Sequence, residues 1–483
     1  MSPTNFRARS FVRSLPLAAG IALSAGFTAR QVSAQAAAAD AETLEHTAAM
    51  AAHHLCSGIF VVGRDYQRTP EQVLEQDVKR FPEFNWQDNF EYRVDMDAHT
   101  ATVWGSGFPA RTAKYHGDQG CTILARDEED VHFRPVRVPR NLPDAATVRW
   151  PMGDVDARGP LPPGADAAKF DAALDWAMNQ GQNTRALVVT YKSKIIGERY
   201  APGFTKDTPQ ISWSMGKSIT AALVGILVQR GELQLDEPAP VAAWQKQGDP
   251  RRDIKIKDLM HMSSGLDFKN RGLNGPDAWR STNEHFLIYF DAINVFDHAV
   301  NQPLDISPNT EFRYRNSDPL TLGRIVRETV EADGENYLTF PQRALFDKIG
   351  ARNYVLETDT YGNFIMTGYD YGSAWDWTRF GLLHLWRGVW NGERILPEGW
   401  VHFVSTPTPT DPRRGYGGLF WLNRGGAMDR VPRDAFWAAG HMGQTTMIIP
   451  SKDMVVVRLG PSPGGFNSYF NDVVGNILEA IEK

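Results

Sequence analysis

Apolar side chains occupy nearly every position of one stretch near the middle of the chain, residues 218–230. A helix on a protein surface would show a polar face, and this stretch has almost none. The pattern therefore predicts a helix that is buried on all sides. Gly231 follows it, at a position where helices commonly end.

Shorter runs of strand-forming residues predict two pairs of β-strands, one on each side of this helix, and a short polar turn separates the members of each pair. The runs are residues 186–191, 195–200, 445–449 and 454–459. Between the pairs, residues 235–400 read as helices and loops, and a last helix is expected over residues 467–481. This order indicates an α/β (α+β) fold: an antiparallel sheet flanked by helices, with a helical insertion.

Residues 35–145 form a smaller pattern ahead of this sheet. A helix is expected over about residues 42–55, and alternating strand patterns follow it. A connection rich in proline and glycine then covers residues 146–164. We therefore predict a small N-terminal accessory domain of α+β type over 35–145, a linker over 146–164, and the main domain over 165–483.

The first 34 residues have the layout of a secretory signal peptide. Three arginines precede an apolar stretch over residues 15–27, and residues 32–34 (Val-Ser-Ala) match a small-x-small cleavage site. The apolar stretch is too short to span a bilayer, which favours cleavage after Ala34 over a stable membrane anchor. The mature protein is therefore expected in the periplasm or outside the cell.

The composition bears on the class of partner. With 42% hydrophobic residues, 22% charged residues and a net charge of −6, the chain has the make-up of an ordinary soluble protein. Lysines and arginines form no basic run of the kind that binds a phosphate backbone. Nucleic acid is therefore not an expected partner.

Two cysteines are present, Cys56 and Cys121, both ahead of the main domain. In an exported protein, two lone cysteines most often form a structural disulfide, which we predict here. A reactive Cys56 beside His53 and His54 is the alternative. Metal binding there is disfavoured, because adjacent histidines on a helix point to different faces.

Ser214 and Lys217 precede the apolar helix and suggest its chemistry. A serine hydroxyl is a poor nucleophile until a neighbouring group removes its proton, and a lysine three residues further along a helix lies on the same face. A lysine at the mouth of a buried helix is costly to keep charged, so its pKa is expected to fall. The pair therefore predicts a nucleophile, Ser214, with a basic Lys217.

Two further motifs follow in order: Tyr314-Arg315-Asn316 in a segment rich in turn formers, and residues 440–444 (Gly-His-Met-Gly-Gln) before a strand. With Ser-x-x-Lys, they make the chain resemble the penicillin-recognising serine hydrolases, related to class C β-lactamases. In motif it is most similar to 6-aminohexanoate-dimer hydrolases and family VIII esterases. The resemblance covers about residues 165–483 and implies a β-lactamase/transpeptidase-like fold.

The same resemblance implies roles for the other motif residues. Tyr314 would relay a proton to the leaving group, in a phenolate-like state favoured by Lys217. Asn316 would hold the Lys217 ammonium and a substrate amide. The backbone N–H groups of Ser214 and Gln444 would stabilise an oxyanion, and Gly443 would let the substrate approach the strand.

A second serine, Ser462, lies in a Gly-x-Ser-x-Gly pattern like that of α/β-hydrolases. That fold needs the backbone N–H of the residue after the serine, and Pro463 has none. It also places a histidine after the serine, and the last histidine of the chain is His441. Ser462 is therefore interpreted as a loop serine.

These features predict an exported serine hydrolase that cleaves a linear amide, similar to a 6-aminohexanoate oligomer, through an acyl-enzyme. A carboxylesterase or a D-amino-acid peptidase could use the same site, and a non-catalytic binding protein remains an alternative. The expected partner is a small-molecule substrate, and the family chemistry needs no metal and no cofactor. The sequence does not determine the oligomeric state.

His441 stands where β-lactam-hydrolysing relatives offer a lysine to the substrate carboxylate. A histidine is mostly neutral near pH 7 and would give a hydrogen bond in place of a full charge. Poor β-lactamase activity is therefore expected.

Overall fold

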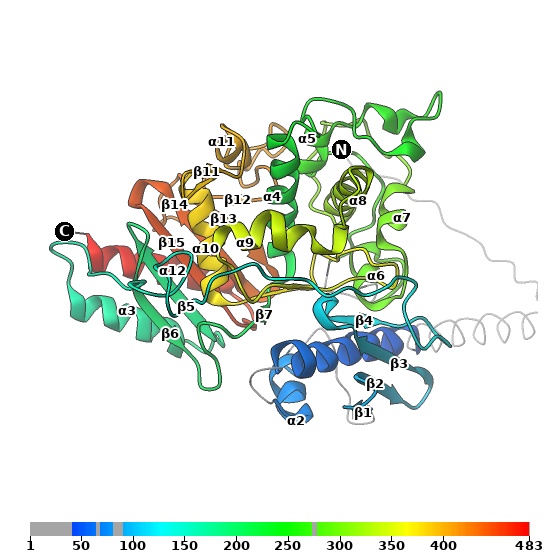
Figure 1. The fold of residues 1–483 in the computed structure, drawn as a ribbon, viewed down its shortest axis with the longest axis horizontal. Coiled ribbons are helices and arrows are strands. Elements are labelled where there is room, and N and C mark those ends of the chain that lie inside the picture. Colours follow the sequence, from blue (N-terminus) through cyan, green and yellow to red (C-terminus); the bar gives the residue numbers. More distant parts are fainter. Residues whose placement is uncertain (1–40, 64–67, 81–89, 273–277, 483) are drawn as a thin grey trace, which may run out of the picture.

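The computed structural model describes residues 41–63, 68–80, 90–272 and 278–482 (Figure 1). The signal peptide predicted over residues 1–34 lies outside these ranges. Within them, no helix combines the length and the apolar character needed to cross a membrane.

A six-stranded antiparallel sheet forms the centre of the main region, in the order β12-β13-β14-β15-β5-β6. Its strands are β5 (Ala186–Tyr191), β6 (Lys194–Tyr200), β12 (Trp421–Leu422), β13 (Phe436–Gly440), β14 (Gln444–Ile449) and β15 (Met454–Leu459). The two strand pairs expected from the sequence meet where β15 pairs with β5, with Leu459 opposite Ala186. The prediction of a sheet built from segments far apart in the chain is confirmed.

Helices cover both faces of this sheet because alternate strand residues point to opposite sides. In β15, Val455 and Val457 belong to one buried core and Val456 to another. Helix α10 (Ala374–Leu385) covers the first face, where a Cβ on Gly381 would come within 2.5 Å of a Val455 methyl. Helices α3 (Ala167–Asn179) and α12 (Phe466–Ile481) cover the second.

The predicted buried helix is α4 (Gly216–Gln229), and all of its residues through Leu227 are buried. It lies among the helices of the middle region: α5 (Ile256–Met260), α6 (Glu284–Phe290), α7 (Val295–Val300), α8 (Ser317–Ala332), α9 (Asp347–Ile349) and α11 (Trp400–Val404). A small sheet has the strand order β7-β9-β8, and its first strand, β7, comes shortly before α4 along the chain. The strands are β7 (Gln210–Ile211), β8 (Val355–Leu356) and β9 (Asp370–Gly372). The hairpin of β10 (Val389–Trp390) and β11 (Glu393–Arg394) lies between α10 and α11 along the chain.

The N-terminal region consists of a helix over residues 41–56 that continues as a π-helical turn, and a four-stranded sheet. Its other elements are α2 (Pro70–Val73), a second π-helical turn (Leu74–Val78), β1 (Glu91–Asp95), β2 (Thr100–Gly105), β3 (Phe108–Tyr115) and β4 (Cys121–Ile123). Ala48, Ala52 and Leu55 join the same buried core as Trp213 of the main region. Glu357, fully buried, accepts hydrogen bonds from the Ser57 hydroxyl and the Cys121 backbone, at 2.7 and 2.8 Å. The division into an accessory and a main domain stays a prediction.

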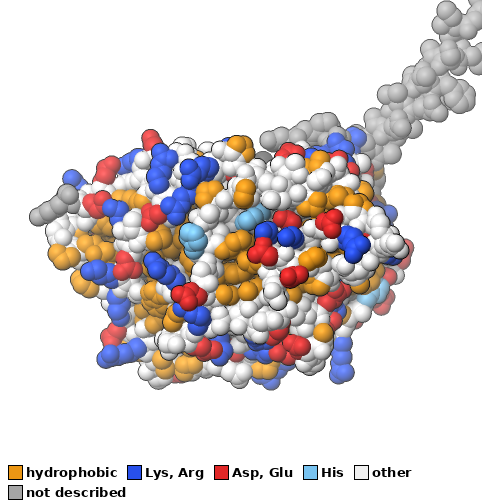
Figure 2. Space-filling view, turned by 90° about the horizontal axis from the view of Figure 1, so that it is seen from above, with side chains coloured by type: hydrophobic (Ala, Val, Ile, Leu, Met, Phe, Trp, Pro, Cys, Tyr) orange, Lys and Arg blue, Asp and Glu red, His pale blue; other side chains and the backbone are white. Residues whose placement is uncertain are grey.

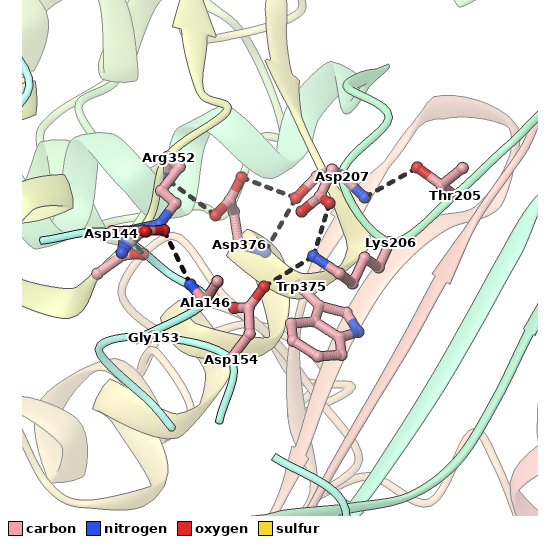
Figure 3. Close-up of polar contacts among 12 residues, drawn as sticks. Asp144, Ala146, Gly153, Asp154, Thr205, Lys206, Asp207, Arg352, Trp375 and Asp376 are labelled. Carbon is pink, nitrogen blue, oxygen red and sulfur yellow. Dashed lines mark hydrogen bonds and ion pairs between the residues drawn. The ribbon is translucent and has the colours of Figure 1, made fainter. Parts of the chain in front are cut away.

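The connection before α3 is docked against the main region. Figure 3 shows Asp154 and Lys206 pointing toward one another beside Trp375, at 2.8 Å. Asp154 also accepts from Arg379 of α10 at 2.9 Å, and Arg379 donates to the Pro151 carbonyl at 2.7 Å. These contacts tie part of the predicted linker to α10.

Charged side chains of both signs are mixed over the face of the molecule in Figure 2, with apolar side chains between them. This mixture agrees with the mild net charge of −6. It is unlike the single-sign basic surface that a phosphate backbone would attract.

Cys56 and Cys121 lie within disulfide-bonding distance, with their Cα atoms 6.1 Å apart and both side chains fully buried. We expect them to be joined in the mature protein, which would stabilise it by roughly 4 kcal/mol on the chain-entropy model. Alkylation in denaturant without reductant, followed by mass spectrometry, should find no thiol. Two alkylated thiols in native material would contradict the prediction.

Candidate active site

Ser214 lies in a single 3₁₀ turn, Trp213–Met215, between β7 and α4. Trp213 has a φ of +52°, which is strained for a residue with a side chain. Its ring is buried and held edge-on against Tyr289 and His441, with centroids 5.9 and 5.5 Å away. Packing therefore fixes this turn, and Ser214 remains partly exposed on it. It does not cap the helix, because α4 begins two residues later.

Lys217 meets Ser214 as the sequence spacing predicts. Its Nζ lies 2.8 Å from the Ser214 Oγ and 3.3 Å from the Thr367 carbonyl oxygen. The Ser214 hydroxyl also donates to that carbonyl, at 3.2 Å. Burial lowers the pKa of Lys217 to about 7, although the charge of Asp370 opposes the change. A large fraction of Lys217 is therefore neutral at physiological pH and able to accept a proton.

Tyr314 stands beside the pair, and the Lys217 Nζ lies 5.0 Å from its ring centroid. Burial raises the pKa of Tyr314 to about 12, although a hydrogen bond with Ser214 lowers it in part. The phenol is thus protonated at neutral pH. The direction of this shift, set by burial, does not support the expected phenolate-like Tyr314 in the resting site.

Asn316 is fully buried and its partners differ from those expected. Its Nδ2 donates to the His285 carbonyl at 2.8 Å and to the Tyr289 hydroxyl at 2.9 Å. In the described structure its Oδ1 has no hydrogen-bond partner, so the expected bond to Lys217 is absent. Tyr289 in turn donates to the Thr367 carbonyl at 2.5 Å. Asn316 therefore reaches the nucleophile indirectly, through Tyr289 and Thr367.

Three residues of the site lie outside the three sequence motifs: Tyr289, Thr367 and Asp370. Asp370 is fully buried, and a Cβ on Gly216 would come within 2.3 Å of its Oδ1, which places the carboxyl at the first residue of α4. Burial raises its pKa well above the usual range. No local pattern marks these residues, because each acts through contacts between distant segments.

The hairpin of β13 and β14 carries the third motif. Gly440, at the end of β13, is the residue that approaches the nucleophile turn: a Cβ there would lie 2.0 Å from the Ser212 carbonyl oxygen. His441 follows it, partly exposed and packed on Trp213. The strand end beside Ser214 is therefore that of β13.

Gly443 ends the turn, and Gln444 begins β14 directly opposite Gly440. A Cβ on Gly443 would lie 2.2 Å from the Phe466 ring, so the glycine makes room for α12. Its expected role in substrate approach stays a prediction. The Gln444 side chain is buried and donates to the Gly460 carbonyl at 2.8 Å. The Oε1 atom of the same side chain accepts a hydrogen bond from the Gly460 backbone N–H, also at 2.8 Å.

Ser462, the rival serine, is buried and donates to Gln182, which agrees with a loop role. Among the described residues, no group of three or more His, Cys, Asp or Glu side chains is arranged to hold a metal ion. The grouping around Ser214 combines a hydroxyl, a lysine with a lowered pKa and a protonated phenol. Such a set can perform acyl transfer with proton relay.

The chain is similar to known proteins both in sequence and in fold. A family-wide sequence profile described as Beta-lactamase matches residues 170–467. The 6-aminohexanoate-dimer hydrolase of Paenarthrobacter ureafaciens is 22% identical over 361 residues, which are 69% of this chain and 88% of that protein.

Two solved structures share the fold. One, from Bacillus anthracis and assigned as a 6-aminohexanoate-dimer hydrolase, has a TM-score of 0.54 at 19% identity, over 74% of this chain and 92% of that chain. The other, a family VIII carboxylesterase, has a TM-score of 0.50 at 13% identity, over 67% and 99%. At these identities the likeness concerns the fold alone.

Proposed function

Because this chain belongs to the beta-lactamase family, we propose that it is an exported serine hydrolase that cleaves a linear amide through an acyl-enzyme on Ser214. The family and fold predicted from the three motifs, and the class of serine hydrolase, are confirmed. The observation that carries the finer proposal is the 2.8 Å contact between the Lys217 Nζ and the Ser214 Oγ. A neutral lysine at that distance can remove the hydroxyl proton.

The proposed reaction has two halves. Lys217 takes the Ser214 proton while Oγ attacks the substrate carbonyl, and the tetrahedral intermediate collapses when the leaving amine receives a proton through Tyr314. A phenol protonated at neutral pH, with a pKa of about 12, can donate that proton and recover one from Lys217. Water then attacks the acyl-enzyme with the same groups, which releases the acid and restores Ser214.

Two backbone N–H groups are proposed to stabilise the oxyanion. The first belongs to Ser214 itself. For the second we propose His441 in place of Gln444, because His441 follows the residue that lies against Ser212. The Gln444 side chain makes its shortest hydrogen bonds to Gly460, both at 2.8 Å. One such donor typically contributes on the order of 3 kcal/mol to the transition state.

The proposed substrate is a linear amide of the 6-aminohexanoate-oligomer type. The support is the relative from Paenarthrobacter ureafaciens, which is named a 6-aminohexanoate-dimer hydrolase. Esters would pass through the same acyl-enzyme and need less help with leaving-group protonation. Ester cleavage is therefore the companion activity to be measured beside amide cleavage.

Export is proposed on two grounds. The first 34 residues have the composition of a signal peptide, and the buried Cys56 and Cys121 lie within bonding distance. A disulfide persists in an oxidising compartment and not in a reducing cytosol. Fractionation of the native host, with detection of a chain that begins after residue 34, tests this assignment.

Linear substrates are expected to be hydrolysed faster than a β-lactam, because His441 offers no lysine charge to a β-lactam carboxylate. The measurement compares kcat/KM for nitrocefin with that for linear amides and p-nitrophenyl esters. The kcat/KM of the best linear substrate should exceed that of nitrocefin at least tenfold, which corresponds to about 1.4 kcal/mol in transition-state free energy. If nitrocefin were the best substrate by a wide margin, the argument from His441 would be wrong.

The proposal as a whole is tested with a fluorophosphonate probe on the purified protein. A single adduct on Ser214, located by peptide mass spectrometry, is expected. No adduct and no turnover of any amide or ester would instead favour the non-catalytic alternative.

A further inference from the structure

A fully buried arginine, Arg458, lies in β15 behind the hairpin turn that carries His441. Among the described residues no carboxylate is paired with it, and its guanidinium instead donates to oxygens of the surrounding chain. It meets the carbonyls of Met442 and Gly443 at 3.3 and 3.2 Å, and also that of Gly460. On its other side it donates to the Thr184 hydroxyl at 3.1 Å and to the Gln182 carbonyl.

Such a residue is costly to bury. Burial lowers the pKa of Arg458 to about 10, which still leaves the guanidinium charged at neutral pH. A charged group without an ionic partner is tolerated inside a protein only where hydrogen bonds satisfy it. Here backbone carbonyls supply most of those bonds, so the side chain and the turn hold each other in place.

The turn that Arg458 binds is in an unfavourable backbone conformation. Met442 and Gly443 have φ angles of +56° and +86°, and the first of these is strained for a residue with a side chain. The Ser462 backbone N–H donates to the Met442 carbonyl at 2.8 Å, which adds a second restraint. A turn of this kind persists only where the surroundings determine it.

The start of this turn contacts the residues that precede the nucleophile. Gly440 lies against Ser212, and His441 packs on Trp213, the neighbour of Ser214. A shift of the turn by 1 Å would therefore displace His441 relative to Ser214. Misplacement of that size can cost about a hundredfold in rate.

We propose that Arg458 is a positioning residue, which holds residues 441–443 in register with Ser214 and acts on catalysis through their backbone. This inference rests on the proposed function only for its kinetic consequence. The role it assigns is distinct from that of the motif residues, because Arg458 touches neither Ser214 nor Lys217 in any contact of the described structure.

The test replaces Arg458 with Met and with Lys. Arg458→Met should lower kcat for a p-nitrophenyl ester on the order of a hundredfold while KM changes less than about threefold, because only the transition state needs the exact donor position. Arg458→Lys, which keeps the charge and one donor group, should lose less. Active-site titration with the fluorophosphonate probe corrects both values for the folded fraction.

Arg379→Met is the matched control. Arg379 is also buried, and it also donates to backbone carbonyls, those of Pro151 and Gly153, but it lies on α10. The Arg379→Met variant should have a lower melting temperature than the wild type and an unchanged kcat. An unchanged kcat in the Arg458 variants would overturn the inference, and so would an equal loss of kcat in Arg379→Met. If Arg458→Met does not fold, the kcat of Arg458→Lys provides the test.

Hydrogen exchange separates this inference from the proposed function. Amides of residues 440–444 should exchange at least tenfold faster in Arg458→Lys than in the wild type or in Arg379→Met. Unchanged exchange contradicts the positioning role whatever the activity. A wild type that neither labels nor turns over substrate contradicts the proposed function alone.

Discussion

Replacing Ser214 with alanine is expected to abolish hydrolysis and fluorophosphonate labelling and to leave the fold intact. The Oγ is the atom that forms the acyl bond, so its loss removes the covalent route, and kcat should fall by at least about 10⁴-fold. Its structural cost is small. The hydroxyl donates to the Thr367 carbonyl at 3.2 Å, accepts from Lys217 at 2.8 Å and also bonds with Tyr314, and each bond is worth on the order of 1 kcal/mol.

The measurement is kcat/KM with the best ester or amide of the panel, together with probe labelling and a thermal melt. Ser218→Ala is the matched control, since Ser218 is buried one turn later on α4 and donates to the Leu419 carbonyl at 2.8 Å. It should keep full activity and labelling. Full turnover by Ser214→Ala would end the proposed mechanism.

Replacing Lys217 with alanine is expected to reduce kcat nearly as much, because a nucleophile and its base act as one unit and their effects do not add. Lys217→Arg should be no better. An arginine retains its charge at all accessible pH values and cannot serve as the base. Both variants are compared with the wild type after correction for folded protein, and substantial activity in either would remove Lys217 from the role of base.

The pH profile tests the same residue without mutation. The base must be neutral, and the pKa of Lys217 is lowered to about 7 by burial. The kcat/KM of the wild type should therefore rise with pH through about 7 and level off above it. A profile that is flat between pH 5 and 9 would show that no group with this pKa limits the reaction.

Much of the fold follows from local patterns. The helix predicted from the apolar run at 218–230 is α4, and the four predicted strands form the centre of the sheet. Apolar periodicity specifies these elements because burial of the side chains is what stabilises them.

The catalytic motifs were predictable to different degrees. The Ser-x-x-Lys spacing brings the two side chains together in the structure at 2.8 Å. For the third motif, the structure shows Gly440 against Ser212 and Gly443 against Phe466. The roles expected for Gly443 and Gln444 stay predictions. Hairpin register and docking depend on partners far along the chain, and no local pattern reports them.

The sequence by itself determined what depends on spacing and on apolar content: the buried helix, the strand pairs, and Ser214 three residues before Lys217. Only the tertiary structure decided the chemistry of those groups. The pKa of Lys217 depends on burial by other segments and on Asp370, Asn316 bonds to Tyr289 and not to Lys217, and Arg458 meets the turn behind His441. Each of these facts depends on which distant segments pack against one another. Packing removes water from the buried groups and sets their hydrogen-bond partners, and residues adjacent in sequence do not determine either.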